Sequence, residues 1–352
     1  MEHRKHPLIS PVPGTERQID SFHYGPADAE RHLYIQGALH ADELPGMLVA
    51  WTLKQRLAEL EAQGLLACRV TLVPVANPVG LDQQLMDTPL GRYDFESLTN
   101  FNRRYANVAD EIADGLDAAL DDDIAHNRDL IRDRFEAALD AMTPTTTLES
   151  MRLTLQRLAC HADFVLDLHC DFDAVEHLYT TPAAWPVFEP LARYFGAKAS
   201  MLATDSGGQS FDECFTLVWE RLRQTFGDRF PLDYGCQSVT LELRGQRDVD
   251  HDLAAHDAQA IIDWLRHLGL VAGEAPPLPE LAYPATELAA MDFLHAPIGG
   301  CWCSTPSRER PSRRGSSSPR SSTRSAIASS RSARRRRACS TLAASAAWPR
   351  PA

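Results

Sequence analysis

The sequence predicts an α/β fold in which a largely parallel sheet is covered by helices on both faces. Short apolar runs alternate along the chain with longer stretches whose apolar residues recur at helical spacing. Polar residues suited to catalysis follow three of the apolar runs, which is where open α/β sheets gather their active sites. At 352 residues, 44% of them hydrophobic, the chain is long enough to bury one large core.

The first predicted elements are a buried strand at 32–39 and a helix that begins near Leu44, where apolar residues recur at roughly helical spacing. A second strand follows at 67–75 and ends at the turn sequence Asn-Pro-Val-Gly of residues 77–80. A polar loop then extends to about Tyr105.

Residues 107–161 are predicted to be helical, because acidic and apolar residues alternate there at helical period, with a break at 142–144. We interpret this segment as an insertion between core strands and expect it to form a wall or lid beside the functional site. The remaining predicted elements are strands at 163–170, 177–181 and 236–243 and helices at about 187–195, 210–226 and 252–268.

The chain is predicted to divide into three parts. Residues 1–272 contain the alternating strands and helices. The Pro-rich stretch EAPPLPELAYP then belongs to a linker that continues into the start of a small β module, at 273–303. Residues 304–352 are rich in Ser, Arg, Pro and Ala and have almost no periodic apolar residues, so we expect a basic, low-complexity, disordered tail.

Composition argues against several functional classes. The net charge is −13 although the tail carries twelve arginines and one acid, so the rest of the chain is strongly acidic, which disfavours nucleic acid as its main partner. No stretch approaches the roughly 18 apolar residues of a membrane span, and the first residues lack the apolar run of a signal peptide. The eight cysteines show no disulfide framework. We therefore expect a cytoplasmic protein without a membrane partner, and the oligomeric state stays open.

Two histidines and two glutamates stand at the ends of predicted strands. His40 and Glu43 lie in one turn after the first strand, and His169 lies at the end of a strand far along the chain. Two histidines and one carboxylate form a ligand set that holds catalytic zinc and leaves one position for water, whose pKa falls to about 7. Glu242, at the end of another strand, is then free to take a proton from that water.

Each of these residues also has a purely structural interpretation. A His-x-x-Glu pattern taken alone binds a metal in about one case in ten, His169 fits a buried core histidine, and Glu242 fits an ion pair with Arg244. Asp167 shares a strand face with His169, where it either orients a ligand histidine or caps a nearby helix. Their joint position at three strand ends favours the metal site.

The polar loop before Tyr105 offers positive charge for a substrate. The guanidinium of arginine binds carboxylates through two parallel hydrogen bonds, and Asn102 with Arg103 is the favoured site for a substrate carboxylate. Arg92 is the candidate for stabilising the oxyanion that forms when hydroxide attacks an amide carbonyl. A solvated surface arginine is the alternative for Arg92 and Arg104.

Six motifs follow one another in a characteristic order: HADELPG at 40–46, ANPVG at 76–80, FNRRY at 101–105, DLH at 167–169, GGQSFDE at 207–213 and TLELRGQRDV at 240–249. In this order they resemble the succinylglutamate desuccinylase/aspartoacylase family, a branch of the zinc carboxypeptidase-like hydrolases. The resemblance covers about residues 30–300.

The resemblance implies hydrolysis of the amide bond of an N-acyl amino acid or a related small carboxylate. It also implies a zinc carboxypeptidase-like fold, with a mixed, largely parallel sheet of eight strands and often a small C-terminal β domain. The implied roles are one zinc ion per chain bound by His40, Glu43 and His169, general acid/base chemistry by Glu242, binding of the substrate carboxylate by Asn102 and Arg103, and polarisation of the scissile carbonyl by Arg92.

The chain departs from this family pattern in three places. The family usually has an acid just before Asn-Arg, where this chain has Asn100 and Phe101. The gap between Arg92 and Asn102 is longer than in aspartoacylases. After about Gly300 the expected β module gives way to the basic tail, as a truncated or aberrant module. A shifted reading frame is the favoured hypothesis for that change, and a tail that binds nucleic acid or acidic surfaces is the other.

Two other functions stay open beside the deacylase. One is a zinc carboxypeptidase that acts on short peptides, which are substrates with the same free carboxylate. The other is an inactive binding or scaffold protein, because the C-terminal sequence is unusual.

Overall fold

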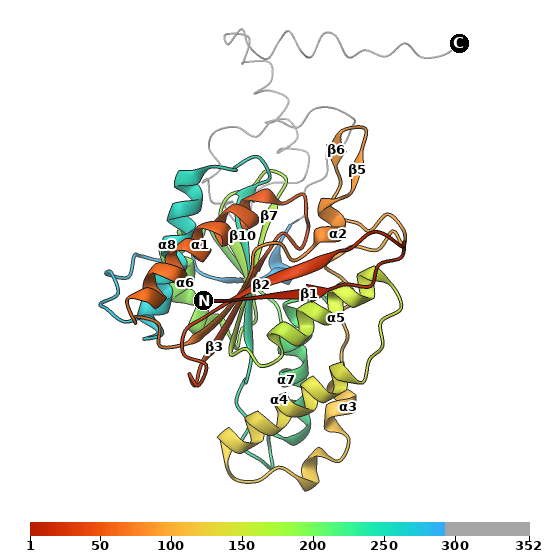
Figure 1. Ribbon diagram of the computed structural model, residues 1–352. Helices are drawn as coiled ribbons and strands as arrows, with labels where there is room; N and C mark the ends of the chain where they lie inside the picture. The colour runs from red at the N-terminus through yellow and green to blue at the C-terminus, as the bar shows by residue number, and fades with distance from the viewer. Residues whose placement is uncertain (293–352) are drawn as a thin grey trace, which may run out of the picture. The chain divides into compact units, whose positions relative to one another are not determined.

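The computed structural model describes residues 1–292, and they form a mixed, mostly parallel sheet of nine strands with helices on both faces (Figure 1). This confirms the predicted α/β class. The nine strands are β1 (Glu2–Pro7), β2 (Gln18–Tyr24), β3 (His32–Gly37), β4 (Arg69–Val73), β7 (Phe164–Asp171), β8 (His177–Thr180), β9 (Ala199–Leu202), β10 (Gln237–Gly245) and β11 (Thr286–Glu287). A separate small hairpin consists of β5 (Gln84–Leu85) and β6 (Thr88–Pro89).

The helices occupy the segments between the strands. They are α1 (Leu44–Ala62), α2 (Pro78–Leu81), α3 (Ala109–Ala113), α4 (Ile124–Asp140), α5 (Thr147–Ala159), α6 (Trp185–Phe195), α7 (Glu213–Phe226) and α8 (His251–His267), with short 3-10 turns η1 (Leu116–Ala118) and η2 (Leu288–Ala290). Among the described residues, no helix is both long and apolar enough to cross a membrane.

The order of the strands brings the predicted functional segments to one edge of the sheet. The order is β1-β2-β4-β3-β7-β10-β8-β9-β11. Strand β3 runs parallel to β4 and β7, and β10 runs parallel to β7. The carboxyl ends of β3, β7 and β10 therefore lie next to one another, which is where parallel sheets form their sites. Antiparallel pairing of β2 with β4 and of β10 with β8 makes the sheet mixed.

The two faces of the sheet carry two separate hydrophobic cores. Helices α1, α6 and α8 cover one face, where the rings of Phe188 and Trp264 stack with centroids 5.5 Å apart. Helices α3, α4, α5 and α7 cover the other, where Phe135 and Phe215 lie 6.0 Å apart (Figure 1). Because β3 and β7 are buried on both faces, their sequences are nearly continuous apolar runs rather than alternating ones.

The predicted helical insertion at 107–161 is helical in the structure and belongs to the second core. The side chain of Asp123 accepts hydrogen bonds from the first backbone amides of α4, and Thr146 and Glu149 form a capping box at the start of α5. The buried side chains of this segment pack against α7 and the sheet. The insertion is therefore a structural layer of the domain.

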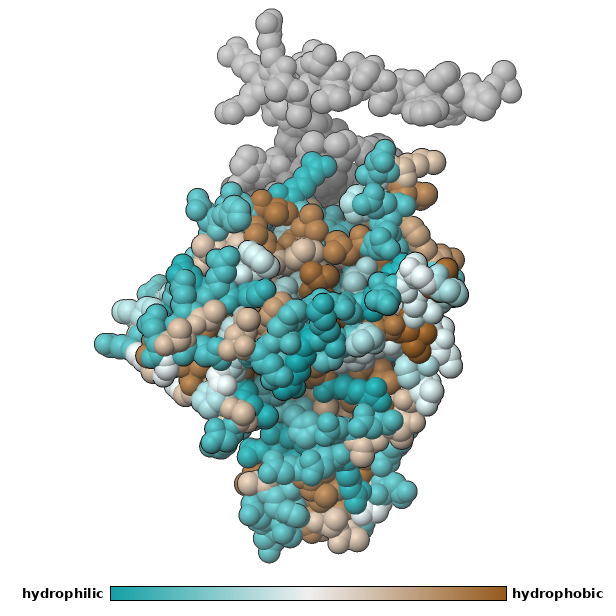
Figure 2. Space-filling model, viewed as in Figure 1, coloured by the Kyte–Doolittle hydropathy of each residue, from teal (hydrophilic) through white to brown (hydrophobic). Residues whose placement is uncertain are grey.

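The surface differs between the two layers. Hydrophobic residues gather over the region of α1, whereas the surface over α4 and α5 is mostly hydrophilic (Figure 2). On α1, Leu44 is 40% and Trp51 is 51% exposed. On α4, the exposed positions include Asp129 and Asp133. The acidic residues that made the insertion recognisable as helical thus lie on its solvent side.

Several strands of the sheet were not predicted from the sequence. Strand β1 is an edge strand whose residues EHRKHP are mostly exposed, so it shows no apolar alternation. Charged residues on an edge strand also disfavour pairing with other chains. Strands β9 and β11 are only four and two residues long. Such short elements carry too few residues for a pattern to be visible.

The chain from Met1 to Met291 forms one compact unit. Strand β11 lies in the segment expected to be a linker and pairs with β9 at the edge of the sheet. Most of the expected start of a β module, at 293–303, and the whole basic tail at 304–352 lie outside the described residues.

A buried histidine in β3 is expected to make the protein sensitive to acid. His32 is 8% exposed, and its Nε2 lies 2.9 Å from the hydroxyl of Thr71. Burial lowers the pKa of His32 to about 3, and the charge of Arg69 adds to that effect. The unfolded chain protonates this imidazole near pH 6.5, so between pH 6.5 and 3 the unfolded state binds more protons and stability falls as the pH falls.

The His32→Gln variant is therefore expected to lose less stability on acidification than the parent protein. For this group the loss amounts to about 2 kcal/mol between pH 6.5 and pH 5, measurable by urea unfolding at both pH values. His251→Gln, which changes an exposed histidine, serves as the control. An unaltered pH dependence in His32→Gln would contradict the assignment.

Candidate active site

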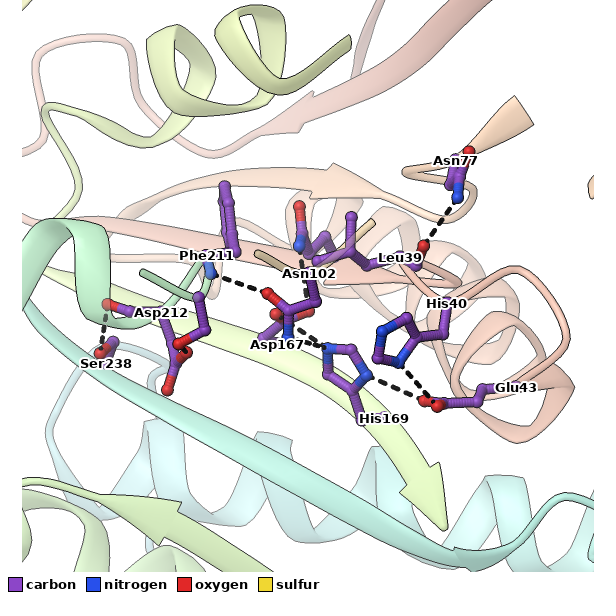
Figure 3. A network of polar contacts seen from close by, with 12 residues as sticks. Leu39, His40, Glu43, Asn77, Asn102, Asp167, His169, Phe211, Asp212 and Ser238 are labelled. Carbon is purple, nitrogen blue, oxygen red and sulfur yellow. Dashed lines mark hydrogen bonds and ion pairs between the residues drawn. The ribbon is translucent and has the colours of Figure 1, made fainter. Parts of the chain in front are cut away.

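The three predicted metal ligands lie together at the carboxyl edge of the sheet. His40, Glu43 and His169 are buried, and one ligand atom from each lies within 4.8 Å of the other two. Glu43 bridges the histidines, because its Oε1 lies 2.8 Å from Nδ1 of His40 and its Oε2 lies 2.8 Å from Nδ1 of His169 (Figure 3). Two imidazole nitrogens and a carboxylate in this arrangement fit a zinc ion.

Two glycines allow the turn that carries His40 and Glu43 to approach β7. A Cβ atom on Gly46, in the first turn of α1, would lie 2.6 Å from the carbonyl oxygen of Leu168, and one on Gly37 would lie 2.6 Å from the carbonyl oxygen of Gly46. Any larger residue would push α1 away from β3 and β7. At this short separation, the backbone amide of Cys170 donates a 3.0 Å hydrogen bond to Glu43 Oε2.

A chain of buried polar groups supports His169 from behind. Its Nε2 lies 3.0 Å from Oδ2 of Asp167. The side-chain amide of Gln36 donates to Oδ1 of Asp167 at 3.0 Å, and the hydroxyl of Tyr34 donates to Gln36 at 2.9 Å. Because a carboxylate only accepts, Asp167 holds a proton on Nε2 of His169, and Nδ1 is the nitrogen that faces Glu43. Of the two interpretations of Asp167, the structure favours the one in which it orients a ligand.

Electrostatic forces in the cluster keep its carboxylate ionised. Burial alone would raise the pKa of Glu43, but the positive charge and hydrogen bond of His169, with those of His40, outweigh it and lower that pKa far below its usual range. Burial likewise opposes the charged form of His169, but Asp167 and Glu43 raise the pKa of that imidazole. The ion pairs therefore offset the cost of burying these groups.

Glu242 lies on the strand next to His169. The two residues are Cα partners in the parallel pairing of β10 with β7, and side chains of partnered residues point to the same face. Burial raises the pKa of Glu242 to about 8; His169 opposes this shift, Glu43 and Asp171 add to it, and Arg92 opposes it. Among residues 1–292, no hydrogen-bond partner reaches the buried Oε2 of Glu242.

The structural alternative for Glu242, an ion pair with Arg244, is not what the structure shows. The guanidinium of Arg244 instead donates to both oxygens of Asp257 on α8, at 3.1 and 2.5 Å, and lies 3.5 Å from Glu176. Arg244 has a positive φ of 65° at an irregularity in the pairing of β10. It anchors the end of β10 and leaves Glu242 facing the cluster.

Arg92 is brought to the metal ligands by a close contact between two loops. Its Nη2 lies 3.3 Å from Glu43 Oε1 and its Nη1 lies 3.3 Å from Nδ1 of His40. The preceding Gly91 accepts a hydrogen bond from the amide of Ala41, and a Cβ at Gly91 would lie 2.3 Å from the nitrogen of Asp42. The long gap between Arg92 and Asn102 therefore does not remove Arg92 from the site.

Asn102 and Arg103 occupy different surroundings. Asn102 is buried, its Oδ1 accepts a hydrogen bond from the amide of Phe211, and its Nδ2 lies 3.4 Å from Nε2 of His169 (Figure 3). Arg103 is exposed and its Nη1 donates to the carbonyl oxygen of Asn102 at 2.6 Å. The GGQSFDE motif supports this loop, because the carbonyl oxygen of Gly208 accepts from the amide of Arg104.

Two residues near the ligands were missed in the sequence. Gln36 connects Tyr34 to Asp167, and Oδ1 of Asn100 lies 2.8 Å from Nε2 of His40. A glutamine in an otherwise apolar, buried strand was a visible signal for the first. Asn100 was noted only as a departure from the family pattern before Asn-Arg, and its contact with His40 was not expected.

Comparisons with known proteins agree with this geometry. Residues 29–268 match the family model of the succinylglutamate desuccinylase/aspartoacylase catalytic domain. A protein described as a member of that family, from Shewanella amazonensis, is 28% identical, with a TM-score of 0.70 over 84% of this chain and 80% of that one. Another, from Shewanella frigidimarina, shares the fold at 24% identity, with a TM-score of 0.73 over 86% and 82% of the two chains. Among curated proteins, none matches the chain.

The Arg244–Asp257 pair is expected to contribute strongly to stability. Both side chains are buried, so Asp257→Ala leaves Arg244 with only the longer 3.5 Å contact to Glu176 and is expected to lower the free energy of unfolding by about 3 kcal/mol. The exposed pair of Arg157 and Asp140, 2.8 Å apart, is the control, and Asp140→Ala is expected to cost less than about 1 kcal/mol. Similar losses in both variants, measured by denaturant unfolding, would refute the anchoring role.

Proposed function

Because the chain belongs to the succinylglutamate desuccinylase/aspartoacylase family, we propose that it is a zinc-dependent hydrolase that cleaves the amide bond of an N-acyl amino acid or a related small carboxylate. The observation that carries this proposal is the pairing of a buried His40-Glu43-His169 cluster with Glu242 on the adjacent strand. That combination, on one edge of the sheet, supports the proposal of a metal-binding set with a proton acceptor beside it.

The three ligands fit zinc by their chemistry and by their supports. Each histidine turns Nδ1 toward Glu43, and each has an oxygen acceptor at its Nε2, from Asp167 for His169 and from Asn100 for His40. When bound here, zinc supplies a Lewis acid that polarises a carbonyl and lowers the pKa of a water molecule. The protein itself sets the positions of the ligands and excludes bulk solvent from the site.

Glu242 is proposed to move the protons of the reaction. Its carboxylate takes a proton from the attacking water and, once protonated, gives that proton to the nitrogen of the leaving amine. Burial raises its pKa to about 8, which favours the protonated form that donates to the leaving amine, and a cation held by Glu43 would favour the ionised form that accepts a proton from water. The absence of a hydrogen-bond partner for its Oε2 within residues 1–292 leaves that oxygen available for water or substrate.

The arginines are proposed to act on the substrate. Arg92 lies within 3.3 Å of two metal ligands, so its guanidinium is placed to stabilise negative charge that develops on the carbonyl oxygen. Arg103, exposed beside buried Asn102, is available for a substrate carboxylate. The proposed substrates are therefore small molecules that contain both a free carboxylate and an amide bond.

Glu242→Gln tests the proton-transfer role. The amide keeps the shape of the side chain but cannot accept a proton, so kcat/KM is expected to fall by about 10²- to 10⁴-fold while the zinc content stays unchanged. N-acetyl and N-succinyl amino acids are the substrates, with dipeptides as the comparison, and Glu111→Gln, at an exposed position, is the control. Full activity in Glu242→Gln would rule out this role, and faster cleavage of dipeptides would favour a carboxypeptidase.

Removal of the metal tests zinc dependence. Dialysis against a chelator is expected to abolish hydrolysis, and one equivalent of zinc per chain is expected to restore it. Because the ion binds only the folded state, zinc at 100 times its dissociation constant is also expected to stabilise the protein by about 2.7 kcal/mol. A purified protein with near-zero metal content and full activity would exclude the proposal, and one with neither metal nor activity would favour an inactive binding protein.

A further inference from the structure

Asn100 contacts the predicted ligand His40 on the side opposite to Glu43. The side-chain Oδ1 of Asn100 lies 2.8 Å from Nε2 of His40 and also 2.8 Å from the backbone nitrogen of Asn102. Asn100 itself is held by an isolated β-bridge to Tyr93. One atom of Asn100 thus connects the loop that carries Asn102 to the imidazole of His40.

These two contacts place a hydrogen on Nε2 of His40. A backbone N–H can only donate, so the atom of Asn100 that faces the amide of Asn102 is the oxygen. The same oxygen faces Nε2 of His40, which must therefore carry the hydrogen and donate it. Nδ1 of His40 is then the nitrogen that faces Glu43 and is available to a metal ion. Nη1 of Arg92 also lies near this nitrogen, at 3.3 Å.

The helical insertion also contacts Asn100, through its backbone carbonyl. Arg152, on α5, is buried and donates from Nη2 to the carbonyl oxygen of Asn100 at 2.9 Å. Its guanidinium also lies over the ring of Tyr105, 5.8 Å from the centroid. One turn further along α5, the side chain of Gln156 exchanges two hydrogen bonds with the backbone of Ala106. Helix α5 therefore clamps the loop 100–106 at both of its ends.

We propose that Asn100 is the positioning residue that makes His40 an Nδ1 ligand, and that Arg152 of the insertion holds Asn100 in place for this task. The inference rests on the zinc site of the proposed function and adds a role for the insertion in metal binding. It also distinguishes the two histidines, since His169 is supported by the carboxylate of Asp167 and His40 by a neutral amide.

The difference in charge leads to opposite expectations for two substitutions. Asn100→Ala removes the acceptor, so His40 is free to place its hydrogen on either nitrogen, and zinc affinity is expected to fall by about 10- to 100-fold. Asn100→Asp keeps an oxygen in the same place and adds a negative charge behind the ligand. It is therefore expected to bind zinc at least as tightly as the parent protein.

The experiment is competition for zinc between a chelating dye and the full-length chain. It compares the parent protein, Asn100→Ala, Asn100→Asp, Arg152→Gln and Thr99→Ala, the last of which removes a neighbouring hydroxyl and leaves both contacts of Asn100. Arg152→Gln is expected to weaken zinc binding in the same direction as Asn100→Ala. Thr99→Ala is expected to match the parent. Urea unfolding of the metal-free proteins shows whether any loss of affinity is only a loss of fold.

A second readout reports the tautomer directly. Nitrogen NMR of the imidazoles in the metal-free protein is expected to show His40 protonated at Nε2 in the parent and in Asn100→Asp, and a mixture of tautomers in Asn100→Ala. Parental zinc affinity and an unchanged tautomer in Asn100→Ala would overturn the inference while leaving the zinc hydrolase intact. A parent chain that binds no zinc would overturn both.

Discussion

The close approach of helix α1 to strand β7 is the constraint on which the rest of the site depends. Glu43 precedes α1 and His169 lies on β7, so the distance between these elements sets the distance between two ligands. A side chain at Gly46 would meet the backbone of β7 at 2.6 Å, and one at Gly37 would meet α1 at 2.6 Å. The backbone of Cys170 donates to Glu43 only because this separation is short. The metal-binding geometry is therefore built into the packing of the backbone.

That packing places polar groups in a region without solvent, where an unpaired group costs several kcal/mol. The chain from Tyr34 through Gln36 and Asp167 to His169 meets this demand, because each member has a partner. His40 is satisfied separately, by Asn100 from a different segment. Networks of this kind hold their members in one arrangement. The protein can thus keep its ligands oriented before an ion arrives.

The fold class and the grouping of His40, Glu43, His169 and Glu242 in space could be predicted because each depends on a regular feature of sequence. His40 and Glu43 are separated by one turn, and His169 and Glu242 end apolar strands that parallel pairing places side by side. The contact of Asn100 with His40 could not be predicted, since it depends on the path of an irregular loop held by a distant helix. Edge strand β1 was missed for a related reason: its exposed residues carry no periodic apolar signal.

Two glutamates in one buried site have opposite charge states, and their surroundings assign their roles. Glu43 lies between two imidazoles, which lower its pKa and keep it an anion suited to hold a cation. Glu242 is desolvated without a hydrogen-bond partner at Oε2 among the described residues, so its pKa rises to about 8. When surroundings shift the pKa values of two groups in opposite directions in this way, one group is suited to stay charged and the other to exchange a proton. A cation held by Glu43 would favour the ionised form of Glu242, since opposite charges attract, and would bring its pKa closer to neutral pH. In the proposed mechanism, the residue that would bind the metal would thereby also prepare the residue that would move the proton.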